Sequence, residues 1–327
     1  MDFSSIQIGR AFRLLVQTMP ILMVRLGVYM LFWLASMVYV AIFFGLAWLL
    51  SMIHPIAAVI GVAIAFGGAI PLMRMARRYV LYVIQAAHIA VVAELLVGRS
   101  IPDGKSQLQW GKEKVTERFG QVSVMFMVDN IVRAIVRRFT AVVSSVLRII
   151  PGNVGRNLSQ MVNRVIRFAT DYIDEAILAR AFWEREASMW KAAKEGVILY
   201  GMVWKPLLMN AVVLMLLSYV PAVLVLVLIV LPVGWLMSMV SSALAVWTVI
   251  VLLILAYIVK LAVGDAFAMI SMVAAYQKAT EGLEPDPAVE EKIEKVSDKF
   301  RELKDKALGQ SGPETVEPQA EAAQASG

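Results

Sequence analysis

The sequence predicts an all-α integral membrane protein in which four transmembrane helices form two helical hairpins. The chain has 327 residues, of which 60% are hydrophobic, whereas roughly 45–50% of the residues of soluble domains are apolar. Residues 26–73 and 206–259 contain no Asp, Glu, Lys or Arg over 48 and 54 positions. Because about 20 apolar residues of helix cross a bilayer core, each run is too long for one crossing and suits two crossings joined by a turn.

The first half of the chain, predicted as residues 1–98, contains an amphipathic helix, the first hairpin and a cytoplasmic-side helix. The amphipathic helix covers 3–23 and is expected to lie at the membrane interface. The turn is predicted at residues 51–55, where Pro55 removes a backbone donor. The returning leg has small residues at spacing four, which favour close helix packing but are also common in any membrane helix. These predicted packing residues are Ala57, Gly61, Ala65 and Ala69.

A basic cytoplasmic or interfacial segment is predicted at residues 99–190. Residues 98–194 contain 16 Lys and Arg against 9 Asp and Glu. We expect one amphipathic helix over 129–150, with Asp129 or Asn130 as its N-cap, and a second over 156–190. Arginines opposite an apolar face suit the surface of an anionic leaflet. The predicted lipid-contacting residues are Arg133, Arg137, Arg138, Arg148, Arg164 and Arg167.

Three carboxylates in the second of these helices, Asp171, Asp174 and Glu175, allow two interpretations. They either bind a cation as a carboxylate cluster, or they form a solvated face or pair with nearby arginines. We favour the second interpretation.

The second half, predicted as residues 191–281, contains the hairpin at 206–259 and a further apolar helix at 261–280. Its turn is predicted at Leu231-Pro232-Val233-Gly234, because Pro lacks a backbone N–H and Gly permits a reversal.

Residues 282–308 are predicted to form a cytoplasmic helix with a coiled-coil-like heptad pattern. The apolar seam would mediate oligomerisation or docking of a partner protein. Residues 309–327 have a composition typical of disorder. The predicted docking residues are Ile293, Val296, Phe300 and Leu303.

Charge also predicts the orientation in the membrane. Neither predicted hairpin turn contains Lys or Arg, whereas the N-terminus, the middle segment and the tail do. The positive-inside rule therefore places both turns outside and both termini in the cytoplasm, in a cytoplasmic (inner) membrane. The plan of the chain also repeats with an offset of about 183 residues, which predicts two parallel halves related by an axis along the membrane normal.

The order of these elements, with the break Ile149-Ile150-Pro151-Gly152 between two interfacial helices, resembles the bacterial sulfate-permease-type membrane family. This resemblance is one of layout, over about residues 5–280 and without a shared motif. It implies that the two helices beside the break penetrate the bilayer part way. The arginines on those helices depart from this pattern, and no functional residue is carried over.

Composition narrows the function. The chain has no cysteine, which excludes disulfides, thiolate catalysis and Cys-ligated metals, and its two histidines, His54 and His88, lie far apart in the predicted topology. No catalytic residue, metal site or cofactor is identified, and the apolar backs of the Arg-rich helices indicate lipid rather than nucleic acid. The sequence favours a non-catalytic membrane scaffold or assembly factor that binds anionic lipid and a partner or itself. The alternative is an oligomeric channel or permease for a small solute.

Overall fold

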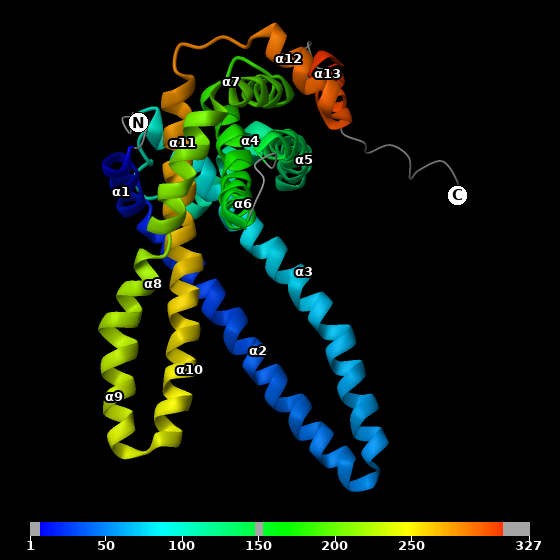
Figure 1. Ribbon diagram of the computed structural model, residues 1–327, viewed down its shortest axis with the longest axis vertical. Coiled ribbons are helices and arrows are strands. Elements are labelled where there is room, and N and C mark those ends of the chain that lie inside the picture. The colour runs from blue at the N-terminus through cyan, green and yellow to red at the C-terminus, as the bar shows by residue number, and fades with distance from the viewer. Residues whose placement is uncertain (1–6, 148–152, 310–327) are drawn as a thin grey trace.

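The structure of the chain, a computed structural model, describes residues 7–147 and 153–309, apart from a number of side chains between 53 and 77 and between 143 and 163. Every secondary-structure element in these ranges is a helix. Figure 1 shows a helical body from which two long arms extend to the same side. In chain order the helices are α1 (Ile8–Gln17), α2 (Met19–Ile53), α3 (Pro55–Leu96), α4 (Gln107–Phe119), α5 (Val122–Leu147), α6 (Asn153–Trp183), α7 (Met189–Leu217), α8 (Val220–Val225), η2 (Leu226–Val230), α9 (Leu231–Val240), α10 (Ser242–Val259), η3 (Lys260–Gly264), α11 (Asp265–Thr280), α12 (Pro287–Val296) and α13 (Asp298–Gly309).

The first arm consists of α2 and the first half of α3. The two helices meet at His54, whose extended backbone (φ −159°, ψ 129°) lies within the predicted turn. The Nδ1 atom of His54 accepts a hydrogen bond of 3.2 Å from the N–H of Ile56, so this histidine caps α3. A Cβ on Gly61 would lie only 2.8 Å from Cδ1 of Leu50 on α2, and Gly61 therefore lets the two helices approach. The side chains of the other three predicted packing residues lie outside the described ones.

The second arm is formed by the end of α7, by α8, η2 and α9, and by α10. Its turn is not at residues 231–234, as the sequence indicated, because these residues are helical in α9. The break is at Ser241, which has an extended backbone (φ −165°, ψ 135°). The prediction was wrong because Pro232 lies in the first turn of α9, directly after the π-helical η2, where a missing N–H is tolerated. Gly234 serves packing instead, since a Cβ there would lie 2.8 Å from Cγ2 of Val249.

Four helices of the described part of the chain are long and apolar enough to cross a membrane. They are Met19–Met52, Arg78–Leu96, Met189–Val240 and Ser242–Thr280. More than half of the most apolar stretch of Arg78–Leu96 is buried inside the body, whereas no residue of the most apolar stretch of Met19–Met52 is buried, although several are partly covered. The returning leg predicted at 56–73 corresponds to the first half of α3, where most side chains are outside the described ones.

The body packs around two buried apolar helices, the second half of α3 and α11. Helices α1, α6 and α7 contact α11, and α4, α5 and α6 contact α3. Close approach depends on glycine at two crossings. A Cβ on Gly111 of α4 would overlap the carbonyl oxygen of Ala87, and a Cβ on Gly264 would overlap that of Ser218. The body therefore has its own closed core, separate from the exposed apolar arms.

Corresponding points of the two halves share their backbone conformation. Each arm has one extended residue at its break, His54 or Ser241. Each returning helix is followed by a glycine with positive φ, Gly98 (79°) or Gly282 (74°). Both arms extend to the same side, as a parallel repeat requires (Figure 1). The superposition of the halves about one axis stays a prediction.

The heptad-patterned segment is covered within the same chain. Ser297 (φ −144°, ψ 108°) divides it into α12 and α13, which pack on α7 and α5. Ile293, Phe300 and Leu303 are buried there, whereas Val296 is partly exposed. The predicted docking seam therefore packs on helices of its own chain, and its role in oligomerisation or partner docking stays a prediction.

Candidate functional site: a buried charged cluster

Charged side chains meet inside the body where α3, α5 and α6 pack together. Helix α5 provides Asp129 and Arg133, α6 provides Asp174 and Glu175, and α3 provides Gln85. We call these five residues the buried charged cluster. Asp174 is completely buried, and Asp129 and Glu175 are nearly so. Such groups are rarely buried unless they are paired, which marks this location as the candidate site.

Arg133 links the two helices that carry the acids. Its Nε atom lies 2.7 Å from Oδ2 of Asp174, and its Nη2 atom donates a hydrogen bond of 3.3 Å to Oδ2 of Asp129. The Nε2 of Gln85 donates to Oε1 of Glu175 and so connects α3 to α6. The N–H of Glu175 donates a 3.0 Å hydrogen bond to Oδ1 of Asp174.

Three carboxylate oxygens of the cluster have no hydrogen bond within the described part of the chain, and only one of them, Oδ2 of Asp174, is in ion-pair contact with Arg133. Oδ1 of Asp129 and Oε2 of Glu175 are both buried, and neither has a donor among the described residues. A buried acceptor without a donor is destabilising, and it is more so if the group is charged. The cluster therefore carries more negative charge and more acceptors than its donors satisfy.

Burial is the main cause of the shifted pKa values in the cluster. Burial, reinforced by the neighbouring Asp129, raises the pKa of Asp174 to about 7, although Arg133 acts in the opposite direction. Burial and the adjacent Asp174 raise the pKa of Glu175 well above its ordinary value. Burial also raises the pKa of Asp129, despite its contact with Arg133. Like charges that share a desolvated site favour a protonated carboxyl.

Further polar contacts lie where the arm helices join the body. Buried His88 of α3 has its Nε2 atom 3.0 Å from Oγ1 of Thr18. The hydroxyl of Tyr172 donates to Oδ1 of Asp265 over 3.0 Å, and Nζ of Lys260 lies 2.6 Å from the same oxygen. These contacts connect helices that continue into both arms.

The structure divides the sequence-predicted lipid-contacting arginines. Arg137, Arg138, Arg164 and Arg167 are exposed, as lipid contact requires, and Arg148 lies outside the described residues. Arg133 does not belong with them, because it points inward to the acids. Arg133 lies at the edge of the buried face of α5. Dividing the helix into one apolar and one basic face placed this residue on the exposed, basic face.

Two expectations for the acids also change. Asp129 is not an N-cap, because α5 begins at Val122 and Asp129 lies in its interior. The three carboxylates of α6 do not form one solvated face, since Asp171 is exposed while Asp174 and Glu175 are buried. The expected pairing with an arginine is confirmed for Asp174, which contacts Arg133. The sequence did contain a signal for the cluster, namely the i, i+4 spacing of Asp129 and Arg133 on a helix with an apolar face. Their partner on α6, more than forty residues away, could not be found without the packing.

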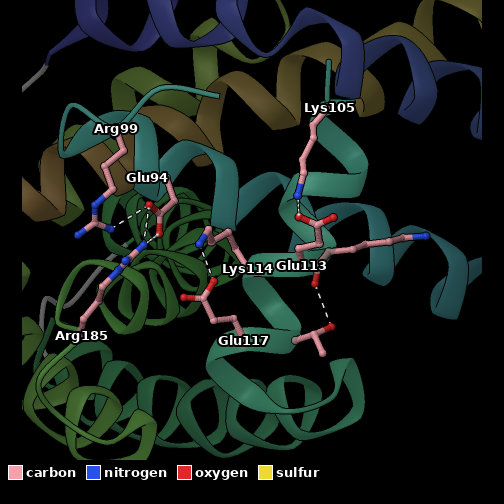
Figure 2. Close-up of polar contacts among 9 residues, drawn as sticks. Glu94, Arg99, Lys105, Glu113, Lys114, Glu117 and Arg185 are labelled. Carbon is pink, nitrogen blue, oxygen red and sulfur yellow. Dashed lines mark hydrogen bonds and ion pairs between the residues drawn. The ribbon is translucent and has the colours of Figure 1, made fainter. Parts of the chain in front are cut away.

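A second polar network fastens the end of α3 to the segment after α6. Buried Glu94 accepts from Arg99 and Arg185, each at 2.9 Å (Figure 2). The pair Lys114–Glu117 on α4, and the pair between Lys105, just before α4, and Glu113 on α4, lie at the surface (Figure 2). Exposed ion pairs of this kind contribute little to stability, and we interpret them as part of the hydrated surface of the body.

The fold and the cluster define an all-helical chain that has four potential membrane-spanning helices and a closed body with a charged interior. Among the described residues, no group of three or more His, Asp or Glu is arranged to hold a metal ion. The chain matches no protein-family model, no curated protein and no solved structure. The resemblance to the sulfate-permease-type family therefore stays a prediction.

Proposed function

We propose that the chain is a multi-pass protein of the cytoplasmic membrane that acts as a non-catalytic scaffold or assembly factor. The observation that carries this proposal is the contrast between the arms and the body. The body has a closed core, whereas the arms expose large apolar side chains along their length, such as Leu31, Trp48 and Leu228. Arms of this kind are stable in lipid and would aggregate in water.

In this proposal both arms cross the membrane as hairpins and the body lies in the cytoplasm. Support comes from the breaks at His54 and Ser241, since neither has a Lys or Arg nearby. Residues 26–73 and 206–259 contain no Lys or Arg, so the basic residues flank the two arms, as the positive-inside rule requires.

The body would contact anionic lipid through its exposed arginines. Arg137 and Arg138 on α5 and Arg164 on α6 are exposed, and each basic residue near an anionic surface contributes roughly 1 kcal/mol to the attraction. Such a surface would hold the body against the inner leaflet and leave its remaining faces for a partner protein or a second copy.

The lipid contact can be tested on the full chain in nanodiscs made from a defined mixture of zwitterionic and anionic phospholipid. We expect that replacing Arg137, Arg138 and Arg164 by Gln lowers the number of anionic lipids retained per protein. A matched variant replaces the exposed Lys292, Lys295 and Lys299 of α12 and α13 by Gln, with the same change in charge, and should retain the wild-type number. Equal retention in all three proteins would refute the lipid-binding role.

An oligomeric channel or permease is a second candidate, favoured by one observation. Arg25, Lys260 and Asp265 are ionisable residues on helices that continue from the arms, and such residues often mark ion or proton pathways in membrane proteins. Flux into proteoliposomes separates the two candidates. Solute-specific flux that an Asp265→Asn substitution abolishes would overturn the scaffold proposal, whereas the absence of flux from a folded, reconstituted protein would overturn the channel.

A further inference from the structure

We propose that the carboxyls of Asp129, Asp174 and Glu175 form a proton-binding site inside the body, in which one exchangeable proton is shared among the three groups. The ligand is a proton taken from solvent, which forms an O–H bond on one carboxylate oxygen and removes one negative charge. This inference concerns the interior of the body and holds for either candidate function.

The charge balance of the cluster requires such a proton. Asp129, Asp174 and Glu175 supply three negative charges when they are all ionised. Arg133 is the only cation in ion-pair contact with them among the described residues. Arg25 is buried and attracts the Glu175 carboxylate by a longer-range electrostatic interaction, without an ion-pair contact. The exposed Arg137 and Asp171 act on the cluster with opposite signs. The two cations Arg133 and Arg25 therefore leave one of the three buried acids uncompensated. A bound proton removes this charge from the desolvated interior.

The geometry offers the proton a location. The carboxyls of Asp129 and Asp174 lie within hydrogen-bond reach of each other, so a protonated Asp174 can donate to Asp129. Oδ1 of Asp129 and Oε2 of Glu175 are buried acceptors without donors among the described residues. A proton shared between Asp129 and Asp174 makes one of two neighbouring carboxyls a donor and leaves the other an acceptor, as in other carboxyl pairs that hold one proton between them.

The helices around the acids bring few other titratable groups. Helix α3 presents the hydroxyl of Tyr82 and the non-titrating amide of Gln85, and α2 presents Arg25. Helix α5 itself presents Arg137, and α6 itself presents Asp171. Helix α11 presents Asp265, which contacts Tyr172. In the described part of the chain, α4 and α7 bring no charged side chain into ion-pair or hydrogen-bond contact with the three acids. The titration near neutral pH therefore belongs to the acids themselves.

The sign of the linkage follows from the raised pKa values. Folding raises the pKa of Asp174 from 3.8 to about 7 and raises that of Glu175 as well, so the folded state holds the proton more tightly than the unfolded state. These groups therefore contribute most stability below the unfolded pKa. The contribution is lost as the pH rises through the folded pKa near 7. Loss of the proton leaves an unpaired charge between α3, α5 and α6, where the first arm joins the body.

Infrared spectroscopy of the full chain in nanodiscs tests the proposal directly. We expect the carbonyl stretch of a protonated, buried carboxyl at about pH 5, and its loss in a titration toward about pH 9. Glu175→Gln together with Asp174→Asn should remove this band. Glu291→Gln, which alters an exposed carboxylate paired with Lys295, should leave it unchanged. The absence of the band from the wild-type protein across this pH range would overturn the proposal, even if the double variant fails to fold.

Thermal unfolding gives a second readout. The unfolding midpoint of the wild type should fall as the pH rises through neutrality. The midpoint of Glu175→Gln should fall by less, because the amide does not titrate and gains no negative charge. The same pH dependence in both proteins would place the titrating group outside this cluster and contradict the assignment.

Discussion

The Nε atom of Arg133 lies 2.7 Å from Oδ2 of Asp174, a carboxylate with no exposed surface. This contact joins α5 to α6 in the interior of the body. A buried ion pair adds little net stability compared with apolar packing, because both charges lose their hydration. Removing only one partner is costly, however, since the other charge is then left buried and unpaired.

We therefore expect Arg133→Gln to lower the free energy of unfolding by about 3–5 kcal/mol near neutral pH, measured by denaturant unfolding in detergent. The loss should be smaller at about pH 4, where the acids are more fully protonated. Arg138→Gln is the control, because its exposed side chain should change stability by less than about 0.5 kcal/mol. An equal effect of the two substitutions would show that the buried pair is absent.

A second prediction concerns the crossing between η3 and the end of α7. A Cβ on Gly264 would overlap the carbonyl oxygen of Ser218, and a backbone atom cannot rotate away as a side chain can. Gly264→Ala should therefore lower the unfolding midpoint, at a cost of about 1–3 kcal/mol.

Gly45→Ala provides the matched control for this crossing. Gly45 lies on α2 with nothing within 4 Å of the position of a Cβ, so alanine should be neutral or slightly stabilising there. If Gly264→Ala behaved in the same way, α7 and η3 would not be in close contact.

A third prediction concerns the docking of α12 and α13 on the body. Phe300 is completely buried, and Phe300→Asp should release these two helices and speed protease cleavage in the connector at residues 281–286. Lys299→Asp changes the neighbouring exposed residue and should leave the cleavage rate unchanged. Size-exclusion chromatography with light scattering should give the same mass for both variants. A drop in mass with unchanged cleavage would instead assign this seam to contacts between copies.

The position of the apolar segments could be predicted because charged residues are costly to place in lipid, and their absence from a segment can be read directly from the sequence. A long run without Asp, Glu, Lys or Arg is identifiable whatever the fold is. The turn of the second arm was misplaced for a local reason, since Pro232 and Gly234 are turn residues by type but are accommodated within a helix by the π-helical segment before them.

The charged cluster could be predicted only in part. The i, i+4 spacing places Asp129 and Arg133 on one face of α5. Whether that face is buried depends on which helix covers it. Asp174 covers it from α6, and the sequence alone gives no reason to prefer Asp174 over the exposed Asp171. Likewise, the seam of Ile293, Phe300 and Leu303 has the apolar pattern of a docking surface, but its partner, α7 of the same chain, becomes known only from the packing.

The central claim is that both arms cross the membrane and that their breaks face outward. The chain contains no cysteine, so single cysteines can be introduced without removing native ones. The variants His54→Cys and Ser241→Cys place a thiol at the two breaks, and Lys299→Cys places one on the body. On intact cells, a membrane-impermeant maleimide should label the first two variants at once and Lys299→Cys only after permeabilisation. Labelling of either break only after permeabilisation, or recovery of the chain in the soluble fraction, would contradict the account.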